Sequence, residues 1–157
     1  MLLLGFLLAS CSWLGGESMR TLEKNRETWE NLDIANYQYT FDVRSYTRGP
    51  SPARIVVRAD TLHAVLDPES KDTLRARSSN RLVWKEWPKQ YLTIDRLFEI
   101  IGEQLYTLYG RPDSIHVEYN EERGYPEHIY IDPQKGTFGD ESRATMEDLV
   151  VNRNDQK

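Results

Sequence analysis

The sequence SIHVEYNEERGYPEHIYID, residues 114–132, predicts a β-hairpin and therefore an antiparallel sheet. On both sides of its turn, apolar and polar residues alternate with a period of two, which is the pattern of strands with one buried face. The turn is expected at residues 121–124, because Gly124 accepts a positive φ angle without steric cost. The apolar positions of the two strands are Ile115, Val117, Tyr119, Ile129 and Ile131.

The tripeptide Gly124-Tyr125-Pro126 at the end of this turn has two interpretations. In the structural one, the glycine permits the turn, the proline fixes the exit of the chain, and the tyrosine ring packs back on the sheet. In the functional one, Tyr125 is an exposed aromatic tip that inserts into a groove of a partner. Gly124, Tyr125 and Pro126 are therefore the candidate partner-binding residues.

The polar face of the hairpin carries a candidate metal site. We expect Ile115 to lie opposite Ile131, and in that register Glu118 lies opposite His128. Two imidazoles and two carboxylates on neighbouring strands form a donor set for Zn²⁺. The alternative is a solvated sheet face, and a slip of one residue in the register removes the cluster. The candidate ligands are His116, Glu118, His128 and Asp132.

A second acidic group flanks a glycine-containing loop after the hairpin and invites comparison with calcium sites. It consists of Asp132, Asp140 and Glu141. The spacing of an EF-hand loop is absent, because the last ligand position of such a loop falls on Arg143. We therefore expect these acids to be solvated loop residues and the protein to hold no cofactor.

Upstream of the hairpin, apolar residues at helical spacing predict an amphipathic helix that ends near Gly110. Thr93 is the expected N-cap, and Asp95 lies in the first turn, where the helix dipole favours a negative charge. Gly110 suits the C-cap, and Pro112 prevents the helix from continuing. The apolar positions are Ile94, Leu97, Phe98, Ile101, Leu105 and Leu108.

The N-terminal half predicts three further strands, at residues 37–44, 53–59 and 62–66, because apolar and polar residues alternate there. The connections between them are too short for the crossovers of a parallel sheet, so we expect an antiparallel meander. Alternating aromatic residues in a strand usually form core. In the first of these strands they are Tyr37, Tyr39 and Phe41.

Other patterns complete the architecture. We expect an amphipathic helix from Glu17 to Asp33, a polar loop over residues 67–80, a strand over residues 81–87 and a short edge strand over residues 149–151. The result is one α+β domain: an antiparallel sheet of about five strands with two amphipathic helices packed on one face. The domain spans residues 19–151, and residues 152–157 are a tail.

The composition agrees with a single folded domain. The chain has 157 residues, of which 39% are hydrophobic and 29% charged, which is enough apolar material for one core. The formal net charge of -5 disfavours nucleic acid as a partner, because nucleic-acid-binding domains carry a basic surplus.

The N-terminus predicts export and lipid attachment. Residues 2–8 are almost wholly apolar and run into Leu8-Ala9-Ser10-Cys11, which matches the lipobox of bacterial lipoproteins. We expect residues 1–10 to be a signal peptide and residues 11–18 a tether. Cys11, the only cysteine, is the expected site of a lipid whose several acyl chains hold the protein to a membrane.

Two alternatives to lipid attachment concern the same segment. A transmembrane helix needs roughly 20 apolar residues, and the apolar run ends before Gly15-Gly16. A buried N-terminal helix with an inert cysteine is the other alternative. Ser12 resembles the pattern of outer-membrane lipoproteins, which places the protein on the periplasmic side of the outer membrane if the host is Gram-negative.

Short motifs distributed along the chain suggest a family. They are Asn36-Tyr37-Gln38-Tyr39-Thr40, Thr93-Ile94-Asp95 with Leu97-Phe98, Pro112-Asp113-Ser114, Val117-Glu118-Tyr119-Asn120, Gly124-Tyr125-Pro126, Ile129-Tyr130-Ile131-Asp132 and Asp140-Glu141. With Trp29, they resemble the DUF6174 family of bacterial secreted proteins and lipoproteins. In the hairpin motif of that family, Asn120 replaces an acid. The resemblance implies a location in the cell envelope and no defined activity.

Three functions are compatible with these observations. The first is a non-catalytic envelope module that binds another protein or an envelope polymer through its sheet face or hairpin tip. The second is a metal-dependent hydrolase that uses His116, Glu118, His128 and Asp132. The third is a structural component without a specific ligand. The sequence lacks the G-x-S-x-G, H-E-x-x-H, P-loop and G-x-G-x-x-G motifs of common enzyme classes, which disfavours an enzymatic function.

Overall fold

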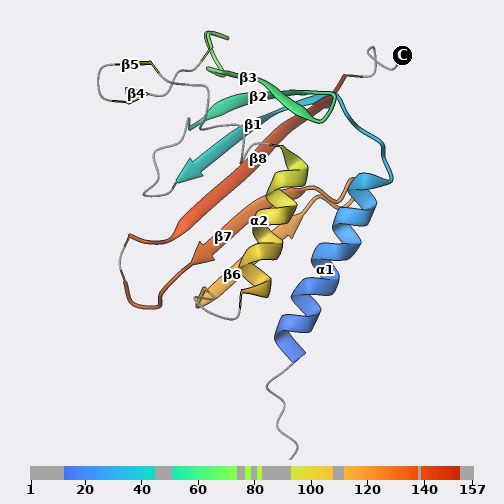
Figure 1. The fold of residues 1–157 in the computed structure, drawn as a ribbon, viewed down its shortest axis with the longest axis vertical. Coiled ribbons are helices and arrows are strands. Elements are labelled where there is room, and N and C mark those ends of the chain that lie inside the picture. Colours follow the sequence, from blue (N-terminus) through green and yellow to red (C-terminus); the bar gives the residue numbers. More distant parts are fainter. Residues whose placement is uncertain are drawn as a thin grey trace, which may run out of the picture.

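The computed structural model describes residues 13–44, 51–73, 77–78, 81–82, 93–107, 112–137 and 139–152. These residues form two layers, a six-stranded antiparallel sheet and two helices that lie on one of its faces (Figure 1). The predicted α+β class is confirmed, with six strands in the sheet where about five were expected. Within the described residues, no helix is both long and apolar enough to cross a membrane.

The sheet joins two meanders through its last strand. Its order is β3-β2-β1-β8-β7-β6, so that β8 pairs with β1 on one side and with β7 on the other. The strands are β1 (Tyr37–Arg44), β2 (Ala53–Arg58), β3 (Thr61–Leu66), β6 (Ser114–Tyr119), β7 (Pro126–Asp132) and β8 (Ser142–Val151).

The strand prediction for the C-terminal region is corrected by β8. Residues 149–151 were expected to form a short edge strand, whereas they end a ten-residue strand in the middle of the sheet. A register shift opposite Gln38 and Thr40 interrupts the alternation of β8, and Asp148 has a φ angle of 53°. Because this irregularity breaks the alternation of apolar and polar residues, the sequence did not reveal the full strand.

The expected strand at residues 81–87 is described only as β5 (Arg81–Leu82), which pairs with β4 (Arg77–Ser78) in a separate two-stranded sheet. Residues 83–87 lie outside the described residues. The loop predicted before them contains an isolated bridge between Leu66 and Thr73.

Helix α1 spans Trp13–Glu30 and differs from the prediction at both ends. It begins inside the expected tether, of which residues 11 and 12 lie outside the described residues. After Glu30 the hydrogen bonding tightens: the Leu32 and Asp33 N–H groups donate three residues back, to the Trp29 and Glu30 carbonyls, and Asp33 adopts a φ angle of 49°. Leu32, which follows the helix, is 41% exposed.

Helix α2 spans Ile94–Tyr106, and its start is as predicted. The Thr93 hydroxyl accepts a hydrogen bond from the Arg96 N–H at 3.2 Å. The helix ends before the expected cap, Gly110, which lies outside the described residues. Thr107 is the C-cap, and its extended backbone and its hydroxyl bond to the Glu103 carbonyl, at 2.6 Å, close the last turn.

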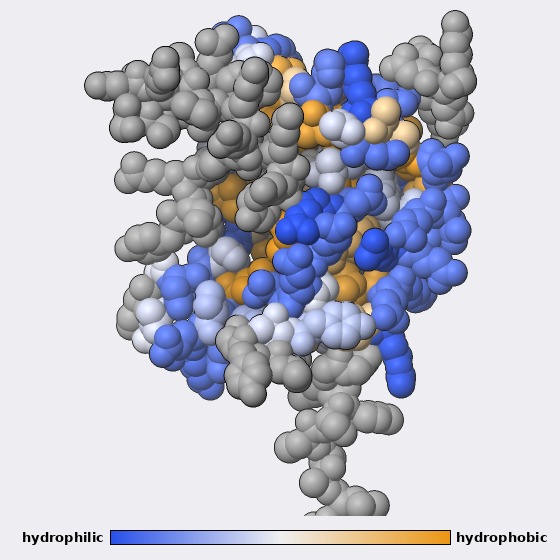
Figure 2. Space-filling view, in the orientation of Figure 1, coloured by the Kyte–Doolittle hydropathy of each residue, from blue (hydrophilic) through white to orange (hydrophobic). Residues whose placement is uncertain are grey.

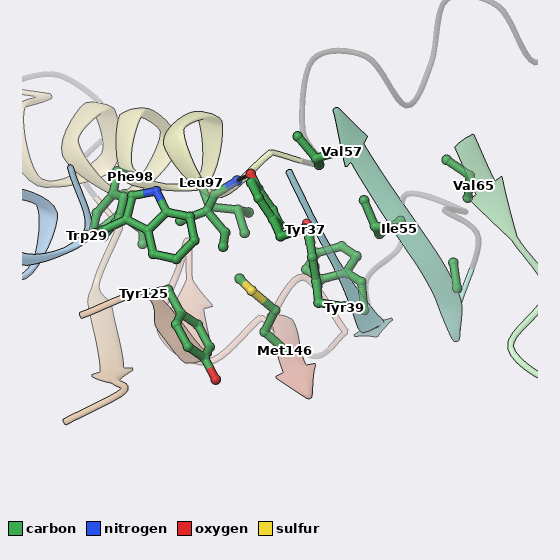
Figure 3. Packing of buried hydrophobic residues seen from close by; sticks show 14 of the residues in the cluster. Trp29, Tyr37, Tyr39, Ile55, Val57, Val65, Leu97, Phe98, Tyr125 and Met146 are labelled. Atoms are coloured by element: carbon green, nitrogen blue, oxygen red, sulfur yellow. Dashed lines mark hydrogen bonds between the residues drawn. The ribbon is translucent and has the colours of Figure 1, made fainter. Parts of the chain in front are cut away.

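The core lies between the sheet and the helices, and aromatic rings dominate it (Figure 3). Tyr37 is its centre: the Trp29 ring meets it edge-on at 5.4 Å, and the Tyr39 ring stacks on it at 6.2 Å. The expectation that these alternating aromatics form core is confirmed. The largest fully buried side chains are Tyr37, Tyr39, Phe98, Ile55, Ile94, Ile101, Val57, Val65 and Pro126.

The hydroxyl of Tyr37 also completes the cap of α2. Ile94 is the first residue of the helix, so its N–H has no acceptor within the helix. That N–H donates to the Tyr37 oxygen at 2.9 Å in a buried position. Burial raises the pKa of Tyr37 far above its ordinary value, and the hydroxyl therefore stays neutral.

Replacing Tyr37 by Phe should destabilise the protein by about 1–3 kcal/mol, because a buried helix N–H loses its acceptor while the ring is retained. Urea denaturation gives the difference in the free energy of unfolding. Tyr106→Phe is the matched control, since Tyr106 is 68% exposed and should change stability little. Equal stabilities of the two variants would contradict the capping role.

Candidate functional site

The register of the hairpin is as predicted. The Cα partners of β6 and β7 include Ile115 with Ile131 and Glu118 with His128. The hairpin therefore presents His116, Glu118, His128, Tyr130 and Asp132 on one face of the sheet, and its apolar residues on the other.

The register does not bring the four predicted metal ligands together. His116 Nε2 lies 3.3 Å from Glu118 Oε1, and both side chains are largely exposed. His128 and Asp132 are four residues apart on one strand, a separation of about 13 Å at the rise of a β-strand. In the part of the chain that the structure describes, no three His, Cys, Asp or Glu side chains are grouped to hold a metal ion.

The loop between β7 and β8 begins and ends with acids that are only partly satisfied. Asp132 and Asp140 each have one carboxylate oxygen, Oδ1, that is inaccessible and has no hydrogen-bond partner among the described residues. Glu141 accepts a hydrogen bond from the Gly139 N–H at 3.1 Å. These acids do not form a group of three ligands among the described residues, so the calcium interpretation gains no support.

The tripeptide Gly124-Tyr125-Pro126 serves the turn and is not an exposed tip. Tyr125 is 7% exposed, and its ring meets Trp29 of α1 edge-on at 6.2 Å (Figure 3). Pro126 is fully buried. The burial of Tyr125 agrees with the structural interpretation of this motif, although its ring packs on α1, and it does not fit an exposed aromatic tip.

Gly124 is required by its backbone and by its surroundings. Its φ angle is 77°, and a Cβ atom added there would lie 2.3 Å from the backbone oxygen of Asn25 in α1. No side chain fits such an approach, because the obstacle is backbone on a helix. The hairpin turn is thus pressed against α1 at this residue.

Asn120 organises the same turn with both ends of its amide. Its Oδ1 accepts from the backbone N–H groups of Glu122 at 3.2 Å and Arg123 at 2.9 Å. Its Nδ2 donates to Glu127 Oε1 at 2.7 Å, an oxygen that also accepts from the Tyr125 hydroxyl at 3.2 Å. Burial first, and the Glu127 charge second, raise the pKa of Tyr125 to about 12.

This geometry explains the departure from the family motif at position 120. An aspartate also accepts from the two backbone amides, but it cannot donate to Glu127. The asparagine therefore serves the turn and its neighbour Glu127, and no role in binding a ligand is needed to account for it.

Asp95 is a partly buried acid that the sequence indicated only as a helix-start residue. Burial first, and the charge of Asp60 second, raise its pKa, while a hydrogen bond from the Trp29 side chain lowers it. It lines an open hollow of about 360 Å³ together with Asp60, Thr61, Leu62, Thr93, Arg96 and Glu99. The hydrogen bond from the side chain of buried Trp29 gives Asp95 a structural role at the start of α2.

The face of the sheet opposite the helices is the remaining candidate surface, and we call it the open face. Figure 2 views the other side, where hydrophilic side chains dominate the helices and hydrophobic ones show between them. The open-face side chains alternate with core residues along each strand: Gln38, Thr40, Asp42, Arg44, Arg54, Val56, Arg58, His116, Glu118, His128, Tyr130, Arg143 and Thr145.

Two arginines of the open face differ in their environment. Arg54 Nη1 donates to the Thr40 hydroxyl at 3.0 Å, so it is held within the sheet. The guanidinium carbon of Arg143 lies 5.2 Å from the centre of the Tyr130 ring. The sequence shows neither contact, because both depend on which strands are neighbours.

Replacing Asn120 by Asp should destabilise the folded state by about 2 kcal/mol at neutral pH, because a charge-assisted hydrogen bond becomes a contact of two carboxylates. The repulsion raises the pKa of the pair in the folded state. Protonation at low pH then favours the folded variant, so the loss should shrink as pH falls and be complete at neutral pH. Urea denaturation of both proteins at several pH values measures this.

The double variant Asn120→Asp with Glu127→Gln is the matched control. It moves the amide to the other partner and restores one donor and one acceptor, so it should recover most of the stability. An Asn120→Asp variant as stable as the parent at neutral pH would exclude the proposed contact with Glu127.

Comparison with known proteins gives a family and no activity. The model of a family of unknown function, DUF6174, matches residues 21–151, which include every strand described above, α2, and α1 from Thr21 onward. No curated protein and no solved structure matches the chain. The match covers nearly the whole described domain, so the chain belongs to the DUF6174 family.

Proposed function

We propose that this protein is a lipid-anchored bacterial envelope protein and a non-catalytic binding module whose partner docks on the open face. The observation that carries the proposal is the division of the two sides of the sheet. One side is occupied by the helices, and the hairpin tip is buried against α1. The open face, by contrast, is not covered by either helix (Figure 1).

The proposed cellular location and lipid attachment are based on the segment around Cys11. The lipobox Leu8-Ala9-Ser10-Cys11 supports export and lipid attachment, and Ser12 supports the periplasmic side of the outer membrane in a Gram-negative host. Helix α1 begins at Trp13, two residues after Cys11, so the chain between a lipid-bearing Cys11 and the helix can span at most about 7 Å. Such an anchor would hold the domain close to the membrane.

The open face has the size and chemistry of a protein-binding surface. Six strands spaced by about 4.8 Å and about 20 Å long give a flat area on the order of 500 Å². A standard interface buries about 800 Å² on each partner, so the face supplies a large part of one. Tyrosine and arginine, which interfaces favour, both occur there in Tyr130 and Arg143.

A metal-dependent hydrolase remains the second candidate because of one observation, the confirmed register that places Glu118 between His116 and His128. Only His116 and Glu118 come within contact distance. A metal enzyme would bind Zn²⁺ stoichiometrically, and its melting temperature would fall with a chelator. The binding module should show neither effect.

Replacing Cys11 by Ser should release the protein from the membrane fraction of its host, because the acyl chains have no attachment atom. Fractionation of cells that produce the full chain, with mass spectrometry of the N-terminal peptide, measures both the location and the lipid. Retention of the Ser variant in the membrane fraction would contradict lipid anchoring through Cys11.

A photo-crosslinking amino acid at His128, on the open face, should give a discrete product with a partner in intact cells. The same amino acid at Glu103 is the control, because Glu103 is exposed on α2 at the other side of the sheet. We expect the product from position 128 and not from position 103. Products of equal yield at both positions would count against the open face as the docking surface.

A further inference from the structure

The guanidinium group of Arg143 packs against an aromatic ring on the open face. Its guanidinium lies over the Tyr130 ring at 5.2 Å, and the side chain is exposed. No hydrogen bond or ion pair joins this side chain to another described residue, and a guanidinium has five N–H donors. Contact with the ring restricts the side chain in advance and lowers the entropy cost of binding.

A second arginine faces Arg143 across the sheet. Arg44 and Arg143 are Cα partners on β1 and β8, and two like charges in this arrangement destabilise a sheet. Arg44 Nε lies 3.8 Å from Asp42 Oδ2, a long ion pair, and the Arg44 side chain is 84% exposed. An anion between the two guanidinium groups would remove the repulsion.

The two arginines belong to a row that crosses four neighbouring strands. Arg44, Arg143, Tyr130 and His116 follow one another from β1 through β8 and β7 to β6. The arrangement differs from that of Arg54, whose guanidinium already donates to Thr40. The row thus offers the guanidinium of Arg143, an aromatic surface, and a second arginine whose ion pair with Asp42 is long, at 3.8 Å.

We infer that Arg143, held on Tyr130 and opposite Arg44, anchors a carboxylate of a protein that docks on the open face. This inference rests on the proposed function and names the chemistry of its binding surface. A guanidinium binds a carboxylate through two parallel hydrogen bonds, which gives orientation as well as affinity. Arginine and tyrosine are also the residues that most often carry the binding energy of interfaces.

The neighbours of the row favour a protein over a uniform polyanion. Acids surround the row: Asp42 lies beside it on β1, Glu118 on β6, and Asp132 two residues beyond Tyr130 on β7. The whole chain carries a net charge of -5. These charges repel a polymer of uniform negative charge. A protein surface with charges of both signs can place one carboxylate at the arginines and its cationic groups near the acids.

A direct test uses the full chain in detergent micelles and a capped, otherwise neutral peptide that contains one glutamate. The side-chain Nε–H resonances of Arg143 and Arg44 should shift with this peptide and not with its glutamine counterpart. Arg54 should not respond. Shifts of equal size at all exposed arginines, or none at Arg143, would overturn the inference.

A cellular test uses the crosslinker at His128 with substitutions in the row. Arg143→Gln should lower the crosslinked product at least about tenfold, equivalent to about 1.4 kcal/mol of binding free energy. Arg143→Lys should give an intermediate yield, because lysine keeps the charge but cannot form the two parallel hydrogen bonds of a guanidinium. Arg58→Gln, which removes an exposed arginine from another part of the same face, should leave the yield unchanged.

The outcomes separate this inference from the proposed function. A product at position 128 that survives Arg143→Gln would leave the binding module intact and overturn the anchor. A product that contains an anionic polymer and no protein would also overturn it. Loss with Arg143→Gln, together with a protein crosslink whose nearby carboxylate is needed for the yield, would support it. Failure of every open-face probe would remove the binding module itself.

Discussion

The hydrogen bond from the Ile94 N–H to the Tyr37 hydroxyl fixes the relation between the sheet and the helices. Tyr37 belongs to β1, the strand on which the N-terminal meander meets β8, so the bond ties α2 to the junction of the sheet. Trp29 then contacts both Tyr37 and Tyr125 and attaches α1 and the hairpin to the same point. A single aromatic cluster therefore positions both helices and both halves of the sheet.

This arrangement commits one side of the molecule to structure. The turn of the hairpin is pressed on α1 through Gly124, and Asn120 satisfies the turn amides and Glu127 together. The Gly124-Tyr125-Pro126 motif is thus explained by its contacts with α1 and within the turn. Its buried groups have partners, so a ligand would have to break contacts in order to use them. Arg143, whose side chain forms no hydrogen bond or ion pair with another described residue, lies on the opposite face.

Local patterns were sufficient for the elements whose determinants lie within a few residues. Alternation and turn chemistry predicted the register of β6 and β7, and Thr93 predicted the start of α2. The central position of β8 could not be predicted, because strand order depends on pairing between distant segments. The burial of Tyr125 depends on α1, and the pairing of Arg44 with Arg143 depends on β8, so periodicity contained no information on either.

The geometry of α1 links the proposed anchor to the proposed docking surface. A helix packed on a sheet runs nearly parallel to the plane of that sheet, and α1 does so from an N-terminus that extends beyond it (Figure 1). With a lipid on Cys11, two residues before the helix, the sheet would stand away from the membrane on this helix. The open face is the side of the sheet that does not carry this helix (Figure 1). The acids that flank the arginine row favour a neighbouring envelope protein over anionic lipid headgroups as the partner of that face.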